Sequence, residues 1–204
     1  LEKGMTVIGL CRSVDQLPDG VKPLACDLRD ESAIRSAFET LERLDILVNS
    51  AGLAYLSRIC DGNPSDWEEM WRVNVHALGI CSQLSLALFP EEGGHILNLS
   101  SMSGHRVPPT GGFYASTKFA VRAVSEALRA ELKNSGNKTR ISCLSPGFVD
   151  TPLLEKYFAG REDQLAETRA NINMLTPEAI ADAALHILTS PASVEINDVL
   201  LRSA

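Results

Sequence analysis

Three residue types that could move a proton at a carbonyl oxygen lie close together near the middle of the chain. Ser101 offers a hydroxyl, Tyr114 a phenol and Lys118 an ammonium. A free phenol has a pKa of about 10, and a neighbouring ammonium lowers that value by favouring the phenolate. Such a phenol could exchange a proton with an alcohol or carbonyl oxygen while the hydroxyl hydrogen-bonds the same oxygen. None of these groups carries electrons, so hydride transfer would need a nicotinamide beside them.

The elements around these residues should bring them together. Residues 95–99, His-Ile-Leu-Asn-Leu, form a short apolar run typical of a buried parallel strand. Ser101 follows the carboxyl end of this run, where open α/β sheets bind their ligands. Residues 113–132 have helical periodicity, which places Tyr114 and Lys118 on one face, one turn apart. The alternative is a surface helix with an ordinary pair at i and i+4, and that spacing alone is weak support.

Five motifs in chain order resemble the short-chain dehydrogenase/reductase family. They are Asn49-Ser-Ala-Gly52, Asn74, Asn98-Leu-Ser-Ser101, the Tyr114 and Lys118 pair, and Ser145-Pro-Gly147. Residues 101–106, Ser-Met-Ser-Gly-His-Arg, are similar to the branch that holds insect farnesol dehydrogenases and a vertebrate 17β-hydroxysteroid dehydrogenase. The resemblance implies a Rossmann-like α/β fold with a doubly wound parallel sheet.

The same resemblance implies roles for four residues. Tyr114 would be the catalytic acid/base, and Ser101 would orient the substrate oxygen, so both would bind substrate. Lys118 would lower the pKa of the tyrosine and hold the nicotinamide ribose. Asn74 would order a water that leads to Lys118. The alternative for Asn74 is an interior asparagine that bonds locally to its own helix.

A nicotinamide dinucleotide would lie along the carboxyl ends of the strands. Arg12 follows a predicted strand where the family meets the adenosine ribose, and its guanidinium suits the 2′-phosphate of NADP. The alternative is a loop arginine in solvent. Asp27 could contact the adenine or could instead cap the next helix. By resemblance, the predicted cofactor-binding residues are Arg12, Ser13, Asp27, Leu28, Asn49, Ala51, Gly52, Tyr114, Lys118, Pro146, Gly147, Val149 and Thr151.

Apolar strands alternate with amphipathic helices along the chain, which favours one α/β domain over residues 1–204. Residues 153–175 are the least regular stretch and correspond, by resemblance, to a mobile substrate lid. Residues 107–112 are a loop rich in proline and glycine. His105 and Arg106 precede that loop, and we expect them to have no catalytic role.

The first residues set a further expectation. Residues 1–4 are predicted to be the last turn of a helix, and no glycine-rich phosphate loop is found in the sequence. The resemblance therefore begins at the family's second strand, and we expect the first strand and helix to be absent from this chain. On this expectation the 204 residues alone would neither fold stably nor bind NADP, because neighbouring strands would lose their pairing partner.

Composition narrows the class of partner. Hydrophobic residues make up 45% and charged residues 22% of the chain, as in an ordinary single domain. The net charge of −7 argues against a surface that binds nucleic acid. No apolar run approaches the ~20 residues of a membrane span. Five cysteines without a C-x-x-C spacing suit a reducing compartment, so we expect a cytoplasmic location and no metal site.

Together these observations predict an NADP-dependent oxidoreductase that interconverts an apolar alcohol, such as an isoprenoid or a steroid, and its carbonyl. NAD is the less favoured cofactor. The predicted assembly is a homodimer or homotetramer, because the helices near residues 67–88 and 113–132 resemble the pair that many family members use for dimer contacts. The alternative is a catalytically inactive relative that serves as a binding or dimerisation subunit.

Overall fold

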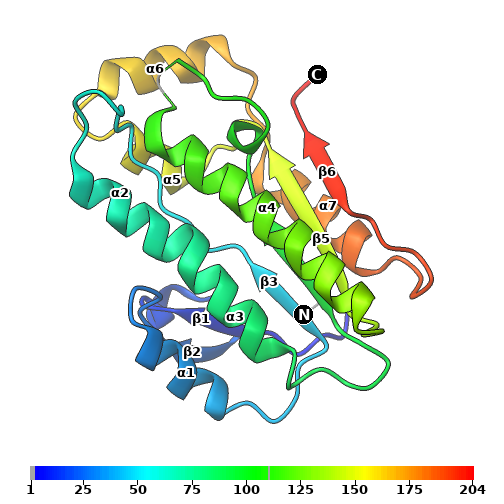
Figure 1. The fold of residues 1–204 in the computed structure, drawn as a ribbon. Helices are drawn as coiled ribbons and strands as arrows, with labels where there is room; N and C mark the ends of the chain where they lie inside the picture. The colour runs from blue at the N-terminus through cyan, green and yellow to red at the C-terminus, as the bar shows by residue number, and fades with distance from the viewer. Residues whose placement is uncertain (1–2, 110) are drawn as a thin grey trace.

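Helices and parallel strands alternate along the chain in the computed structural model, which describes residues 3–109 and 111–204 (Figure 1). Residues 1–2 of the predicted helical turn and Thr110 of the predicted loop lie outside the described residues. In chain order the elements are β1 (Ile8–Cys11), η1 (Val14–Gln16), β2 (Lys22–Ala25), α1 (Glu31–Glu39), β3 (Ile46–Asn49), α2 (Pro64–Trp71), the π-helical segment η2 (Arg72–His76), α3 (Ala77–Ser85), β4 (His95–Leu99), η3 (Met102–Gly104), α4 (Gly112–Asn134), β5 (Arg140–Pro146), α5 (Pro152–Tyr157), α6 (Glu162–Asn171), α7 (Pro177–Leu188) and β6 (Asp198–Leu201).

The strands form two parallel sheets within the described residues. The smaller sheet pairs β1 with β2, and the larger has the order β3-β4-β5-β6. The register of the larger sheet sets Asn49 opposite Asn98, and Leu99 opposite Leu144. Helices connect the successive parallel strands of this sheet, which confirms the predicted α/β fold.

The central strands of the larger sheet are buried on both faces. Ile96 and Ile141 are register partners and pack with Leu132 of α4 on one face. Leu97 and Leu144 pack with Ile187 of α7 on the opposite face. Successive strand residues point to opposite faces, so an unbroken apolar run is what a strand between two helical layers requires. Figure 1 shows α4 in front of the strands and α7 behind them.

The smaller sheet packs on a separate cluster of apolar side chains. Ile34 and Phe38 of α1 meet Ile80 and Cys81 of α3 there, with leucines of β1 and β2 at the margin. The strands β1 and β3, which belong to different sheets, each have an exposed apolar side chain: Ile8 is 36% exposed and Val48 is 43% exposed.

Helix starts follow the local sequence. The Asp30 carboxylate accepts hydrogen bonds from the backbone N–H groups of Ser32 and Ala33, so Asp30 caps α1 and the alternative cap, Asp27, does not. Asn63 and Thr176 cap α2 and α7 in the same way, each followed by a proline in the first turn. The stretch 153–175 is more regular than predicted, because it contains most of α5 and all of α6.

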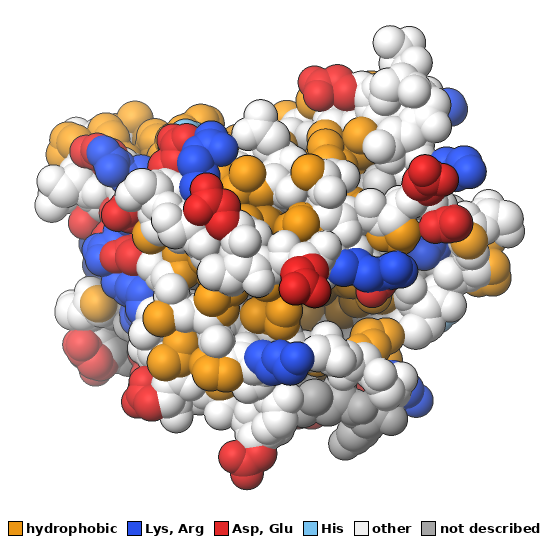
Figure 2. All heavy atoms as spheres, turned by 90° about the horizontal axis from the view of Figure 1, so that it is seen from below, with side chains coloured by type: hydrophobic (Ala, Val, Ile, Leu, Met, Phe, Trp, Pro, Cys, Tyr) orange, Lys and Arg blue, Asp and Glu red, His pale blue; other side chains and the backbone are white. Residues whose placement is uncertain are grey.

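The surface carries both signs of charge. On the face drawn in Figure 2, acidic and basic side chains alternate among hydrophobic atoms. Within residues 3–109 and 111–204, every helix is too short or too polar to cross a membrane.

Candidate active site

Ser101, Tyr114 and Lys118 meet where β4 ends against the first turns of α4. Ser101 caps η3, its Oγ accepts a hydrogen bond from the N–H of Ser103 at 3.1 Å, and its side chain is also hydrogen-bonded to the Tyr114 phenol. The Nζ of Lys118 lies 5.8 Å from the Tyr114 ring centroid. It donates a hydrogen bond to the Leu99 carbonyl at 2.9 Å. The predicted hydroxyl, phenol and ammonium are therefore neighbours.

The electrostatics of this group differ from the expectation that Lys118 lowers the pKa of Tyr114. Burial raises the pKa of Tyr114 to about 12, and the hydrogen bond with Ser101 only partly opposes that effect. Burial also lowers the pKa of Lys118 to about 8. Desolvation disfavours the charged form of each group and is the largest cause of both shifts. At neutral pH the phenol keeps its proton.

Asn74 lies at the centre of a buried network and is 1% exposed. Its Oδ1 accepts from the N–H of Leu53 at 2.7 Å, and its Nδ2 donates to the Leu53 carbonyl at 2.8 Å. The same Nδ2 donates to the Thr117 hydroxyl at 3.0 Å. The alternative of bonding to its own helix is wrong, because the side chain joins the loop after β3 to α4. It sits in the π-helical segment η2, a deviation often found at functional sites.

The Asn49-Ser-Ala-Gly52 segment lies against these residues. A Cβ built on Gly52 would be 3.5 Å from Asn74 Oδ1 and 3.7 Å from Lys118 Nζ. Glycine thus leaves the backbone open beside the buried ammonium. The Asn49 side chain donates to Asn98 Oδ1 at 2.8 Å and to Ser82, so it is bound into the sheet. Ala51 is exposed at the same edge.

Residues predicted to meet the adenosine end of the cofactor lie around the smaller sheet. Arg12 and Ser13 are exposed where β1 ends. Asp27 follows β2, and the side-chain hydrogen bonds of Arg29 lower its pKa to about 2, with a smaller electrostatic contribution from Arg12. Leu28 packs beside the cluster of α1 and α3.

Arg29 was not predicted from the sequence as a residue of the site, although it stands only two residues after Asp27. Its guanidinium pairs with the Asp27 carboxylate and, at 3.0 Å, with Glu69 of α2. Glu69 in turn accepts a hydrogen bond from the Tyr55 hydroxyl at 2.7 Å. The cluster links the loop after β2 to the loop after β3, a partnership that only the tertiary fold creates.

Residues 146–151, at and after the end of β5, lie on the side of the site next to the residues that follow Ser101. Pro146 is buried, and the N–H of Gly147 donates to the Leu201 carbonyl at 2.8 Å. Val149 forms a parallel bridge with Leu175, and Thr151 precedes the first turn of α5. Because Met102 Sδ would lie 3.7 Å from a Cβ at Gly147, this segment faces the residues that follow Ser101.

Two residues with no predicted catalytic role have different environments. Arg106 is exposed. The His105 Nε2, in contrast, is 2.9 Å from the Ser145 hydroxyl and 3.8 Å from a carboxylate oxygen of Asp198. Burial and the nearby Arg122 lower the pKa of His105, while Asp198 opposes that effect. This polar cluster lies directly behind the turn that carries Ser101.

Comparison with known proteins places this arrangement in a family. Residues 5–162 match the family described as short chain dehydrogenase. Dehydrogenase/reductase SDR family member 11 of Bos taurus is 35% identical over 223 residues, which cover 99% of this chain and 88% of the relative. The Homo sapiens protein of the same name is also 35% identical and is covered to 86%.

Solved structures agree with these relatives. The closed form of serine dehydrogenase complexed with NADP⁺ has a TM-score of 0.90 and 30% identity, with 99% of this chain and 86% of that chain covered. An alcohol dehydrogenase from Thermococcus sibiricus complexed with 5-hydroxy-NADP has a TM-score of 0.82 and 26% identity, with 99% and 87% covered. The family match, the relatives and the parallel α/β fold agree: this chain belongs to the short-chain dehydrogenase/reductase family of oxidoreductases.

Proposed function

We propose that the protein is an NADP-dependent oxidoreductase that interconverts an apolar alcohol and its carbonyl compound. The observation that carries the proposal is the hydrogen bond between Ser101 and Tyr114 beside the buried Lys118. A carbonyl oxygen placed against these two hydroxyls would accept a hydrogen bond from each. Bound NADPH would supply the hydride.

Tyr114 serves as the proton donor in the direction of reduction. Its pKa of about 12 leaves the phenol protonated at neutral pH, as an acid must be before it acts. Ser101 holds the same oxygen and aligns the carbonyl for attack. Lys118, an ammonium at neutral pH, holds the nicotinamide ribose.

Asn74 orders the water that replenishes the proton. Its side-chain oxygen and nitrogen already bond to Leu53 and Thr117, so the water contact falls to the backbone carbonyl. The π-helical turn of η2 supports this role, because it alters the backbone geometry at Asn74. The side chain then acts by fixing that turn against the loop after β3.

The residues around the strand ends suit NADP. Gly52 leaves room beside Lys118 for a ribose, and the exposed Arg12 is free to approach a 2′-phosphate. Arg29 pairs with both Asp27 and Glu69, so its single positive charge offsets part of the negative charge of these two carboxylates near Arg12. A dianionic phosphate would meet less repulsion there than it would beside bare carboxylates. Two of the solved relatives are complexes with NADP⁺ or 5-hydroxy-NADP.

The remaining predicted cofactor contacts are part of the same proposal. Ser13 extends the ribose site, and Asp27 with Leu28 borders the adenine. Asn49, Ala51 and Gly52, at the end of β3, contact the nicotinamide half of the cofactor. Pro146, Gly147, Val149 and Thr151 form the wall on the nicotinamide side.

The substrate enters beneath a lid made by residues 153–175. Tyr157 of α5 packs edge-on against Tyr114, with ring centroids 5.9 Å apart, and Phe158 packs against Tyr157. The start of the lid is tied down, since the N–H of Leu56 donates to the Tyr157 carbonyl and Arg161 donates to the Leu56 carbonyl. Exposed Val107 and Phe148 flank the segments on either side of the site. These aromatic and aliphatic groups favour an isoprenoid, a steroid or a similar apolar alcohol.

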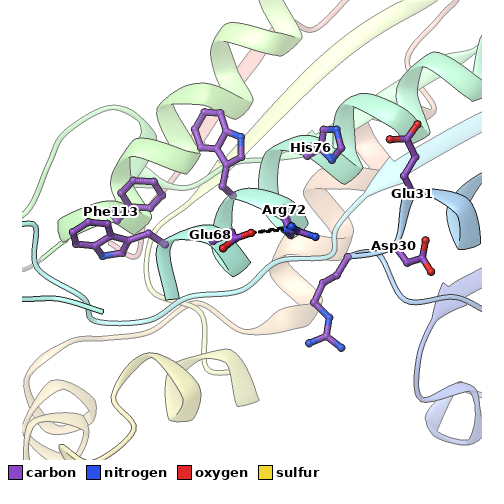
Figure 3. Close-up of a pocket in the computed structure, with 9 residues that line it drawn as sticks. Asp30, Glu31, Glu68, Arg72, His76 and Phe113 are labelled. Atoms are coloured by element: carbon purple, nitrogen blue, oxygen red, sulfur yellow. Dashed lines mark hydrogen bonds and ion pairs between the residues drawn. The ribbon is translucent and has the colours of Figure 1, made fainter. Parts of the chain in front are cut away.

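A second copy of the chain covers the outer faces of α2 and α4. Trp71 is 43% exposed and Phe119 is 39% exposed there. The adjoining cleft has a volume of about 810 Å³. In Figure 3, Phe113 lies at one end of α2 and the Glu68–Arg72 ion pair lies along that helix. The cleft contains none of the proposed catalytic residues, which suits an interface better than a substrate site. Trp71→Glu should lower the mass measured by sedimentation to that of a monomer. An unchanged assembly would rule out this face.

The cytoplasm is the proposed location. All five cysteines are free thiols, and three of them are buried. Unpaired buried cysteines suit a reducing compartment. Fractionation of cells that express the tagged full-length gene product would test this, and a secreted product would contradict it.

A turnover experiment tests the proposed function. The protein made from its full gene is incubated with NADPH and a panel of apolar ketones and aldehydes, with 3-oxo acids as polar controls. We expect NADPH oxidation with at least one apolar carbonyl compound and NADP⁺ reduction with the matching alcohol. Cofactor binding without turnover of any panel member would favour the inactive binding subunit. Turnover of the polar compounds alone would contradict the apolar substrate.

A further inference from the structure

The turn that carries Ser101 is held from two sides. On one side, Gly104 of the turn is in close contact with α4. A Cβ at Gly104 would lie 2.6 Å from Ser100 Oγ and 2.7 Å from the Lys118 carbonyl. Only glycine fits at that distance. Within the turn, the N–H of Gly104 donates to the Ser101 carbonyl at 2.8 Å. A shift of Gly104 would therefore move Ser101.

Arg122 of α4 is hydrogen-bonded to the same turn. It follows Tyr114 and Lys118 at four-residue intervals, so the three side chains share one helix face. Its Nη1 donates to the Gly104 carbonyl at 3.0 Å. Its Nε and Nη2 donate to one oxygen of Asp198 in β6, at 3.1 and 2.9 Å. One guanidinium thus ties the Ser101 turn to the helix of Tyr114 and to the edge of the sheet.

His105 supplies the second attachment. Its Nε2 is 2.9 Å from the hydroxyl of Ser145, a fully buried residue of β5. The same nitrogen is 3.8 Å from Asp198 Oδ1. Asp198 therefore lies between Arg122 and His105, with one carboxylate oxygen toward each. The three side chains connect the Ser101 turn to α4, β5 and β6.

We propose that Arg122, Asp198 and His105 are positioning residues that hold Ser101 against the Tyr114 hydroxyl. An ordinary exposed ion pair joins two side chains and contributes little. Here the guanidinium also bonds a backbone carbonyl three residues from Ser101 and thereby fixes its hydroxyl. The proposal rests on the proposed function, since Ser101 is assigned there to the substrate oxygen.

Arg129 offers a matched control on the same helix. It also bonds backbone carbonyls, those of Ile141 and Asn197, and it lies near the carboxylate of Glu195. None of these partners belongs to the Ser101 turn. Arg122→Gln and Arg129→Gln therefore remove comparable contacts from α4, and only the first should disturb Ser101.

Two measurements on the full-length gene product test the proposal. In Arg122→Gln, amide hydrogen exchange at residues 103–106 should rise about tenfold or more, whereas Arg129→Gln should leave these amides at the wild-type rate. With a carbonyl substrate, Arg122→Gln should lower kcat about 10–100-fold while the KM for NADPH stays within about twofold. Arg122→Lys, which keeps one donor, should be intermediate in both measurements.

The exchange measurement needs no turnover, so it separates this proposal from the proposed function. If no substrate is turned over but exchange at 103–106 rises only in the Arg122 variants, the positioning contacts stand and the reaction assignment fails. If Arg122→Gln and Arg129→Gln change exchange and kcat equally, or neither changes them, the positioning role is wrong. Should Arg122→Gln not fold, Arg122→Lys and Asp198→Asn give the same comparison.

Discussion

The larger and smaller sheets hold their polar residues in opposite ways. Around β3–β6, Asn74, Asn98 and Lys118 are at most 6% exposed, and each is hydrogen-bonded to another element. Around β1 and β2, Arg12 is exposed, and Asp27 is held by an ion pair with Arg29 at the surface.

This difference separates two kinds of function. A buried polar group is tolerated only when its partners are in place, so the region of Tyr114 is fixed by the packing of the whole sheet. Surface ion pairs are weaker and are screened by salt. The region of Arg12 can therefore change its residues, and with them the choice of cofactor, without loss of the fold.

The largest expected combined effect, on both the rate and cofactor binding, is that of Lys118→Met in the buried region. We expect kcat to fall roughly 10³-fold and NADP to bind more weakly, because one ammonium holds the ribose and borders the phenol. The thermal midpoint should change little, because the lost hydrogen bond to the Leu99 carbonyl is offset by the removal of a charge that burial disfavours, as the lowered Lys118 pKa of about 8 indicates. Steady-state kinetics and a melt check both parts. A large loss of stability with normal NADP affinity would assign Lys118 to the fold alone.

His95, at the start of β4, allows a test of how burial of a titratable group affects the pH dependence of stability. It is 2% exposed, and burial lowers its pKa to about 4, with Arg140 adding to the effect. The unfolded chain, with a histidine pKa of about 6.5, binds a proton first as the pH falls. This contribution to stability is present above about pH 6.5 and is lost, by up to roughly 3 kcal/mol, as the pH falls toward 4.

Urea denaturation at pH 7.5 and 4.5 measures this loss. His95→Gln can still donate to the Ser142 hydroxyl but does not titrate, so its stability should fall less than that of the wild type between the two pH values. Equal losses in the two proteins would mean that His95 is accessible to protons in the folded state.

The smallest expected effect on the fold comes from the exposed region. Arg12→Asp should shift the preference from NADP toward NAD by about 10–100-fold, mainly through KM, because a guanidinium suits a 2′-phosphate and a carboxylate suits a bare ribose. Stability should change by less than about 0.5 kcal/mol. Arg35→Asp, which alters an exposed arginine in α1, is the control for charge. Equal NADP affinity before and after the Arg12 change would show that Arg12 faces solvent.

The sequence predicted the features that depend on local spacing. The apolar run at 95–99 became β4, and the four-residue interval between Tyr114 and Lys118 placed both side chains near Ser101. The order of strands and helices predicted parallel pairing, because such strands need a crossover connection. Each of these features can be predicted from the residue pattern within one short segment of the chain.

Features that depend on distant partners were not predictable in the same way. The side chain of Asn74 bonds to Leu53 and Thr117, which are 21 and 43 residues away in the sequence. The packing of distant segments determines both these hydrogen bonds of Asn74 and the burial that raises the pKa of Tyr114. The contacts of Arg29 and His105 also arise where separate loops meet. A single-sequence pattern names such residues without assigning their partners.

The most direct test of the central claim is a single-turnover measurement of deuterium transfer from 4-deuterated NADPH to a ketone that the wild type reduces. Tyr114→Phe should bind NADPH with wild-type affinity and transfer deuterium roughly 10³-fold more slowly or not at all, because the phenol donates the proton. Tyr55→Phe, which removes a phenol that is hydrogen-bonded to Glu69 and not to the Ser101 turn, is the control and should retain most of the rate. Near-normal transfer by Tyr114→Phe would contradict the assignment of Tyr114 as the acid.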